Sequence, residues 1–77
     1  MTKAQAMMQR IWSHQRDDPR GALRVYITGG DPSHEAVLRK LMRQALVTDC
    51  WIDLLRDTVP GVRLTESGIA AVQSSAA

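Results

Sequence analysis

Apolar residues recur every three or four positions along the first part of the chain, from Lys3 to Gln15. This spacing places them on one face of a helix. Thr2 is a suitable N-cap residue, and the stretch 17–21, which contains proline and glycine, is a strong stop signal. The sequence therefore predicts an amphipathic helix. Its buried stripe consists of Ala4, Met7, Met8, Ile11 and Trp12.

The segment from Ala22 to Thr28 has a different pattern, in which apolar side chains alternate with polar residues or tyrosine. A period of two, with β-branched and aromatic residues, is typical of a strand. Gly29 and Gly30 follow directly and would end it. We therefore expect a strand over these seven residues.

A second amphipathic helix is predicted from Pro32 to about Leu46, with Asp31 as its N-cap residue. Arg39, Lys40 and Arg43 fall mostly on one side of it, which gives the helix a basic outer face. The opposite side is the predicted buried stripe, formed by Val37, Leu38, Leu41, Met42, Ala45 and Leu46.

The segment from Val47 to Leu55 admits two interpretations. Its β-branched residues favour a strand, whereas the spacing of Trp51, Leu54 and Leu55 also fits a short helix. A strand is the preferred interpretation. Trp51, like Trp12, lies within an apolar stripe, so both tryptophans are expected to be core residues.

The last third of the chain predicts a turn, a strand and a helix. The stretch 56–61 is turn material, with Pro60-Gly61 supplying the reversal. Val62 to Leu64 would return as the second arm of a hairpin. Thr65 is a suitable N-cap for a closing helix from Glu66 to Gln73.

The predicted order is thus helix, strand, helix, strand, strand, helix, which defines a small α+β fold. At 77 residues the chain has room for a single domain, with a core over about residues 3–73 and a frayed tail at 74–77. Its 44% hydrophobic and 23% charged residues are ordinary for a folded protein. The net charge of +2 is too small to indicate nucleic-acid binding by itself.

Few residues suggest covalent or metal chemistry. The one cysteine, Cys50, has no partner for a disulfide, which fits a reducing cytoplasm. His14 and His34 lack companions at metal-ligand spacing, so no metal and no cofactor is expected. No stretch is apolar enough for a signal peptide or a membrane span, so a cytoplasmic protein without a membrane partner is expected.

Asp31, Ser33 and His34 combine an acid, a nucleophile and a base, but neighbours on one helical turn point in different directions. Gly29-Gly30-Asp31 lacks the lysine and the glycine spacing of a phosphate-binding loop. The sequence therefore does not predict an enzyme.

Two short motifs resemble a known family. Leu41-Met42-Arg43-Gln44-Ala45-Leu46-Val47 and Arg63-Leu64-Thr65-Glu66-Ser67-Gly68, separated by a predicted hairpin, are similar to the second half of winged helix-turn-helix domains. The resemblance covers about residues 35–72. Ala45 stands where the family often has glycine, and Gly68 would let the last helix approach a neighbour closely.

The resemblance departs from the family upstream. A winged helix-turn-helix has a separate helix before its recognition helix, and there is no room for one between Thr28 and Asp31. Either the segment from Ala22 to Thr28 is that helix, against its β propensity, or the domain is an altered variant.

The resemblance implies a non-enzymatic DNA-binding protein, a transcriptional regulator, whose helix from Pro32 enters the major groove of double-stranded DNA. Glu35 would be an unfavourable neighbour for phosphate. An N-terminal helix that pairs with its copy through Met7 and Met8 would form a homodimer. The DNA-binding residues would be Ser33, His34, Ala36, Arg39, Lys40 and Arg43 on the helix, with Arg56 and Arg63 on the wing.

A different class of function is also open. The modest charge and the missing helix favour a protein–protein interaction module or inhibitor, such as an accessory protein of a phage or mobile element, on a winged-helix-like scaffold.

Overall fold

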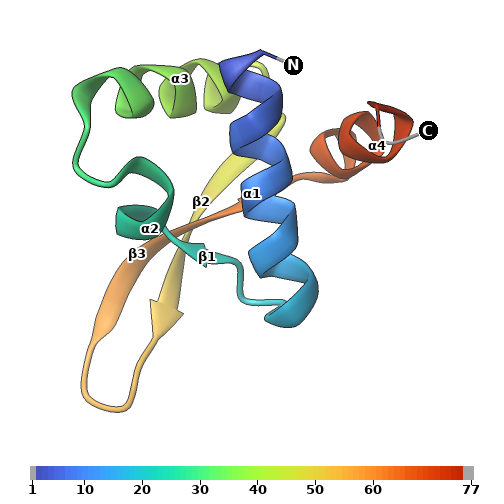
Figure 1. Cartoon of the computed structure of the whole chain (residues 1–77). Coiled ribbons are helices and arrows are strands. Elements are labelled where there is room, and N and C mark those ends of the chain that lie inside the picture. The colour runs from blue at the N-terminus through green and yellow to red at the C-terminus, as the bar shows by residue number, and fades with distance from the viewer. Residues whose placement is uncertain (1, 76–77) are drawn as a thin grey trace.

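A computed structural model describes residues 2–75, which form an α+β fold with a single antiparallel sheet (Figure 1). The elements are α1 (Lys3–Asp17), β1 (Ala22–Leu23), α2 (Arg24–Thr28), α3 (Pro32–Arg43), β2 (Val47–Asp53), β3 (Thr58–Leu64) and α4 (Glu66–Ser75). The three strands lie in the order β1-β3-β2. The α+β class is therefore confirmed.

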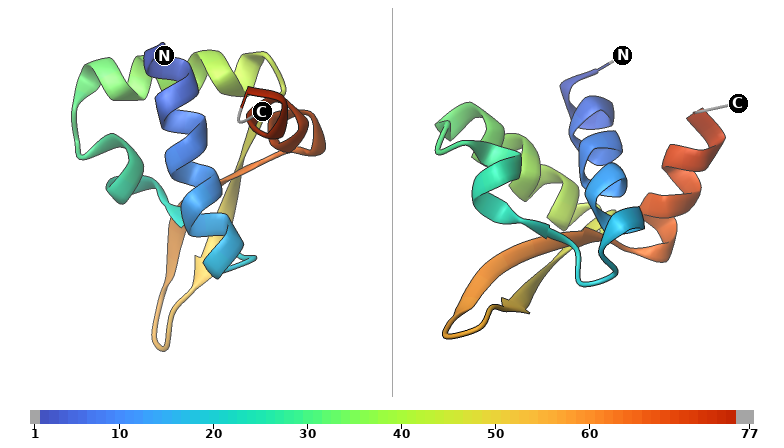
Figure 2. Two further views of the ribbon diagram at one scale, coloured as in Figure 1. Left: turned by 45° about the vertical axis from the view of Figure 1, so that its right-hand side comes forward. Right: turned by 60° about the horizontal axis from the view of Figure 1, so that its bottom comes forward.

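The core lies between α1, α3 and the base of the β2–β3 hairpin, and the far end of the hairpin projects beyond the helices (Figures 1 and 2). Helix α1 packs against β3, α3 and α4. Because the core is confined to one end of the sheet, the rest of the hairpin depends on other contacts. The most deeply buried side chains are Ile11, Ile27, Leu38, Leu41, Val62 and Leu64.

Helix α1 confirms the first prediction. Thr2 and Gln5 form a reciprocal capping box, which satisfies two backbone N–H groups at the start of the helix. Met7 and Met8 are buried in the core of the same chain. A homodimer through exposed methionines of this helix therefore has no basis in the structure.

The strand predicted from Ala22 to Thr28 is largely wrong, because only Ala22 and Leu23 are in a strand and residues 24–28 form α2. Spacing of four between Leu23 and Ile27 also fits a helix, and five residues are too few for periodicity to decide. Gly29 ends α2 in the left-handed conformation (φ 59°), and its N–H donates to the Val25 carbonyl. The observed order thus gains a helix: helix, strand, helix, helix, strand, strand, helix.

Strand β2 confirms the strand interpretation of the next segment, but the turn lies at residues 54–57 and not at Pro60-Gly61. The Leu54 N–H donates to the Asp57 carbonyl across this turn. Pro60 and Gly61 are inside β3, opposite Trp51 and Cys50 of β2.

Proline fits this strand because its nitrogen faces an edge without a neighbouring strand. The Leu64 N–H donates to Gln15 Oε1, away from β2. Alternate residues of an antiparallel strand direct their N–H groups to opposite sides, so Pro60 also turns its nitrogen away from β2. Strand β1 pairs only with Val62 and Gly61, so Pro60 interrupts no hydrogen-bonded ladder.

Helix α3 ends at Arg43, three residues before the predicted end. Ala45 is exposed rather than buried and has φ 59°, the left-handed region that favours glycine. This conformation turns the chain from the helix into β2. A positive φ is also a physical reason for the glycine that winged helix-turn-helix domains often have at the corresponding position.

Helix α4 packs closely against the turn at Ala45. Thr65 Oγ1 accepts from the Gly68 N–H and donates to the Ala45 carbonyl (2.6 Å), which confirms its capping role. A Cβ at Gly68 would overlap the Leu46 carbonyl oxygen, so the expected close approach is present. The helix extends to Ser75, so residues 74 and 75 are helical rather than frayed. Residues 76–77 of the predicted tail lie outside the described residues.

Candidate functional site

The start of α3 is fixed by Asp31, whose carboxylate accepts hydrogen bonds from the Ser33 N–H and the Ser33 hydroxyl, both at 2.8 Å. These bonds hold the pKa of Asp31 below its usual value. Pro32 occupies the first turn, where its missing N–H has no helical partner to lose. The Ser33 hydroxyl is therefore engaged within its own turn, although the side chain is exposed.

The basic face of α3, defined as Arg39, Lys40 and Arg43, is exposed as predicted. Within residues 2–75, none of the three side chains forms a hydrogen bond or an ion pair, although the charge of Arg39 contributes to lowering the pKa of Glu35. Ala36 is exposed one turn before Lys40, so its small side chain leaves backbone accessible there. This face carries unpaired positive charge on a rigid helix.

Glu35, the one acidic residue of α3, is paired with Arg24 of α2. The Arg24 guanidinium donates to both of its carboxylate oxygens, at 2.7 and 3.3 Å, and each side chain is 29% exposed. These hydrogen bonds hold the pKa of Glu35 below its usual value. The pair ties α2 to α3 and neutralises the carboxylate predicted to repel phosphate.

His34 points away from the basic face, toward α1. Its Nδ1 lies 3.2 Å from the Thr28 carbonyl oxygen, and the ring borders a hollow with Met7 and Ile27. Because the Ser33 hydroxyl bonds to Asp31 and not to His34, these residues form no nucleophile–base chain. Within residues 2–75, no cluster of three or more His, Cys, Asp or Glu side chains is arranged to hold a metal ion.

Arg56 and Arg63 are not brought together. Arg56 is in the turn of the hairpin, whereas Arg63 pairs with Thr48 near its base. Val62 and Leu64 point into the core, so Arg63 points to the opposite face of the sheet, beside Gly21. Only Ser33, Ala36 and the basic face therefore share one surface of α3.

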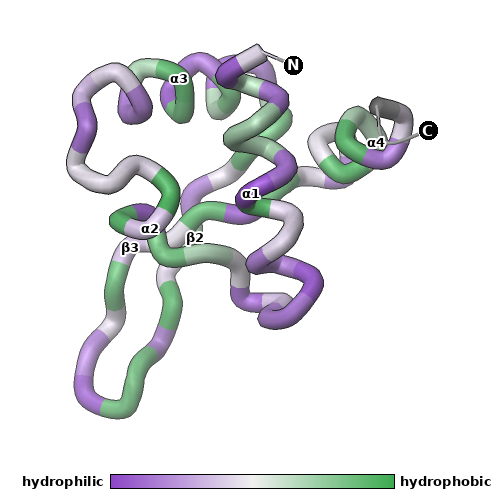
Figure 3. Tube along the Cα trace, viewed as in Figure 1, coloured by the Kyte–Doolittle hydropathy of each residue, from purple (hydrophilic) through white to green (hydrophobic). Residues whose placement is uncertain are grey.

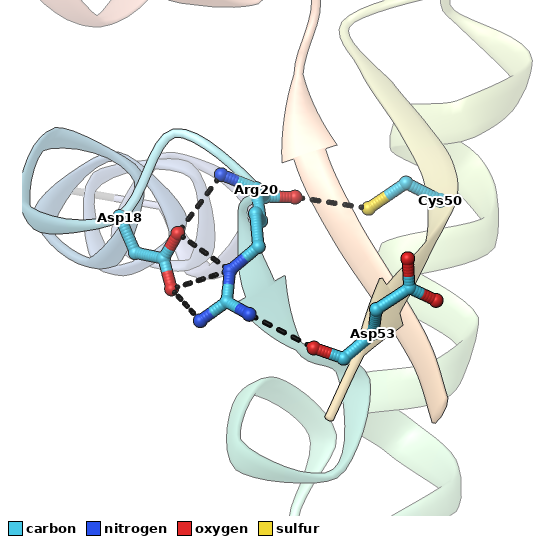
Figure 4. Close-up of polar contacts among 4 residues, drawn as sticks. All are labelled: Asp18, Arg20, Cys50 and Asp53. Atoms are coloured by element: carbon cyan, nitrogen blue, oxygen red, sulfur yellow. Dashed lines mark hydrogen bonds and ion pairs between the residues drawn. The ribbon is translucent and has the colours of Figure 1, made fainter. Parts of the chain in front are cut away.

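A clasp built by Arg20 holds the middle of the hairpin (Figure 4). Its guanidinium pairs with Asp18 at 2.7 Å and donates to the Asp53 carbonyl at 2.9 Å. Its own carbonyl accepts from Cys50 Sγ at 3.3 Å, and burial raises the pKa of that thiol. Ile52 is buried on this face, above Gly61, where a Cβ would lie 2.5 Å from the Ile52 side chain.

The projecting part of the hairpin is unexpectedly apolar (Figure 3). Trp51 is 71% exposed, so its predicted place in the core is wrong. Side chains alternate along a strand, and Trp51 points away from the face where Ile52 is covered. We call the exposed apolar side chains of the turn and of the adjoining helix α2 the apolar patch: Val25, Tyr26, Leu54 and Leu55.

A hollow of about 470 Å³ adjoins the apolar patch, between α2, the start of α3 and the hairpin. Sequence reasoning missed it because its walls come from four separate segments. Two adjacent leucines beside the turn residues Arg56 and Asp57 were the available signal. The apolar walls are Leu23, Val25, Leu54, Val59 and Pro60.

Helix α3 and the β2–β3 hairpin also differ in net charge. Helix α3 has three basic residues and Glu35, a net charge of +2. The hairpin from Val47 to Leu64 has three aspartates and two arginines, a net charge of −1. The site thus combines a basic helix with an apolar, slightly acidic hairpin.

No protein-family model matches the chain, and neither a curated protein nor a solved structure is significantly similar to it. In residues 2–75, no helix has both the length and the apolar character needed to cross a membrane.

Proposed function

We propose that the chain is a winged helix-turn-helix protein that binds double-stranded DNA as a transcriptional regulator. Helices α2 and α3, joined by the turn at 29–31, would be the helix-turn-helix, and β2 and β3 would be the wing. Helix α2 supplies the element that the resemblance lacked. The positive φ of Ala45, where the family often has glycine, and the packing of Gly68 also support this assignment.

The observation that carries the proposal is the basic face of α3. Its three cations are exposed and unpaired within the described residues, whereas Glu35 on the same helix is neutralised by Arg24. An α-helix fits the major groove, where arginine pairs with the acceptors of guanine and lysine neutralises phosphate. The helix would thus supply both affinity and base contacts.

The hairpin has a smaller part in this proposal. Its net charge of −1 is repelled by phosphate, and Arg56 is flanked in the turn region by Asp53 and Asp57. We therefore assign DNA binding to α3 and leave a phosphate contact of Arg56 as a minor contribution.

The test is affinity for random duplex DNA over a series of salt concentrations. Each phosphate contact contributes about −0.9 to the slope of log K against log salt. Arg39→Ala with Arg43→Ala should reduce affinity and make the slope shallower by about two.

The matched control removes the same charge from another exposed surface. Arg10→Ala with Arg16→Ala takes two arginines from α1, and we expect the slope to stay within about 0.5 of the wild-type value. Equal losses in both double variants would indicate a nonspecific effect of net charge and contradict the α3 assignment. Absence of binding by the wild type at low salt would refute DNA binding itself.

A protein-interaction module is the second candidate, and the apolar patch favours it. Large exposed apolar side chains grouped on one surface mark contact sites for other proteins. The two functions use different surfaces, so the chain can have both.

A further inference from the structure

We propose that the apolar patch and its hollow bind a second copy of this chain about a two-fold axis, with Leu55 of each copy seated in the hollow of the other. This contact lies outside the basic face and does not depend on DNA binding. It differs from a dimer through α1, whose methionines are buried.

The hairpin contributes both parts of such a contact, the protruding side chain of Leu55 and one wall of the hollow. Leu55 is fully exposed, at 104%, at the turn of the hairpin. Leu54, in that turn, and Val59, which follows it in β3, form part of the apolar wall of the hollow. A two-fold contact requires one surface that is complementary to itself, and a protruding side chain beside a hollow meets that requirement.

The charges around the turn are self-complementary as well. Arg56 has no ion pair within the described residues, and Asp57 is next to it in sequence, whereas Asp53 already accepts a hydrogen bond from Thr58 Oγ1. A two-fold axis near the turn would place Arg56 of each copy against Asp57 of the other. An unrelated partner would have to supply both signs of charge, whereas a second copy has both in the required order. This complementarity selects a second copy as the occupant.

The contact would form through side chains rather than through a longer sheet. Strand β3 has a free edge beyond Gly61, but Pro60 lacks the N–H that an added strand would use. The bordering Arg24–Glu35 pair is already satisfied, so closing the hollow leaves no unpaired charge there.

The test is the mass of the protein in solution without DNA, measured by sedimentation equilibrium over a range of concentrations. The wild type should be a reversible dimer. Leu55→Asp, which changes a side chain with no contacts to lose in the monomer, should weaken dimerisation by about 100-fold, because one leucine is lost from each half of the interface. Ala70→Asp adds the same charge at an exposed position of α4 and should leave the dimer unchanged.

Cross-linking tests the geometry. In a Cys50→Ser background, chains with Leu55→Cys mixed with chains with Val25→Cys should form a mixed disulfide dimer on mild oxidation. A mixture of Leu55→Cys with Ala70→Cys chains should not. A mixed disulfide with Val25→Cys that forms no faster than with Ala70→Cys would overturn the proposed seat of Leu55.

The two proposals fail separately. Self-association through the apolar patch would be overturned if the wild type stayed monomeric at every concentration, or if Leu55→Asp did not weaken the dimer. The patch would then be a candidate contact site for a different protein. Neither result bears on DNA affinity. Loss of DNA binding in the α3 variant with an intact dimer would support both proposals.

Discussion

Helix α3 and the β2–β3 hairpin pack against each other, yet they expose opposite chemistry. Helix α3 is amphipathic and packs its large apolar side chains against the core, so its fully exposed side chains are polar, charged or small. The hairpin projects past the helices (Figure 2), and its Trp51, Leu54 and Leu55 side chains are exposed. Exposure in this fold therefore depends on how far an element reaches beyond the core and on which of its faces is covered, since Ile52 of the same hairpin is buried.

The largest expected effect concerns the support behind α3. Gly68→Ala places a methyl group against the Leu46 carbonyl oxygen, which is backbone and cannot rotate away. We expect a loss of at least about 3 kcal/mol in the free energy of unfolding, measured by urea titration. Gly30→Ala is the control, because its φ of 75° is strained but nothing lies within 4 Å. That variant should lose only about 1 kcal/mol. Equal losses would show that α4 does not lock the end of α3.

The next effect separates the two faces of the hairpin. Ile52→Ala should cost about 2–3 kcal/mol of unfolding free energy, because Ile52 is buried under the Arg20 clasp. Trp51→Ala, at the neighbouring position, should cost less than about 1 kcal/mol in dilute protein. A larger loss at Trp51 than at Ile52 would reverse the assignment of covered and open faces.

A smaller effect, of opposite sign, is expected where α3 meets β2. Ala45 has φ 59°, so Ala45→Gly should relieve strain and raise the free energy of unfolding by about 0.5–1 kcal/mol. Ala36→Gly, inside α3, should lower it by about 1 kcal/mol. Thermal unfolding of both variants checks the sign. Destabilisation by Ala45→Gly would contradict the left-handed conformation.

The smallest effect depends on pH and concerns the ion pair between α2 and α3. Arg24 lowers the pKa of Glu35 from its usual 4.5, so the unfolded state binds the proton more tightly. The pair's contribution is fully present above about pH 4.5 and is lost as the pH falls through the lower folded value. We expect the contribution to be about 0.5 kcal/mol.

Arg24→Met should remove this part of the pH dependence and return the pKa of Glu35 toward its usual value. An NMR titration of the Glu35 carboxyl group measures the pKa directly. Arg20→Met is the control, because it removes a different ion pair and should leave the pKa of Glu35 unchanged. A Glu35 pKa that does not rise in Arg24→Met would contradict the pair.

Local signals in the sequence predicted most helix starts and the class of fold. The caps Thr2, Asp31 and Thr65 act within three residues, so the chain around each cap contains all the information needed. The helical spacing of α1 and α3 spans several turns and was therefore reliable. In contrast, α2 has only five residues, which is too few for periodicity to identify a helix. Pro60-Gly61 predicted a turn, but these residues are also tolerated at the edge of a strand.

The candidate site was predicted in part. The basic face follows from helical spacing, so Arg39, Lys40 and Arg43 were predicted as a group. His34 was not separated from them, because its direction depends on Thr28 of α2 and on the place of α1 across the fold. The hollow was missed for the same reason, since its walls come from α2, α3, the hairpin and the turn at Gly30.

The caps, the long amphipathic helices and the basic outer face of α3 are thus properties of the amino-acid sequence alone, because they depend on residues within a few turns of one another. Packing between distant segments decided three other features. Strand β1 stops at Leu23 and the chain continues as α2, Ile52 is buried whereas Trp51 is exposed, and a hollow lies beside Leu55. Burial depends on which distant segments pack nearby, and the hydrophobic effect acts on whatever surface they cover.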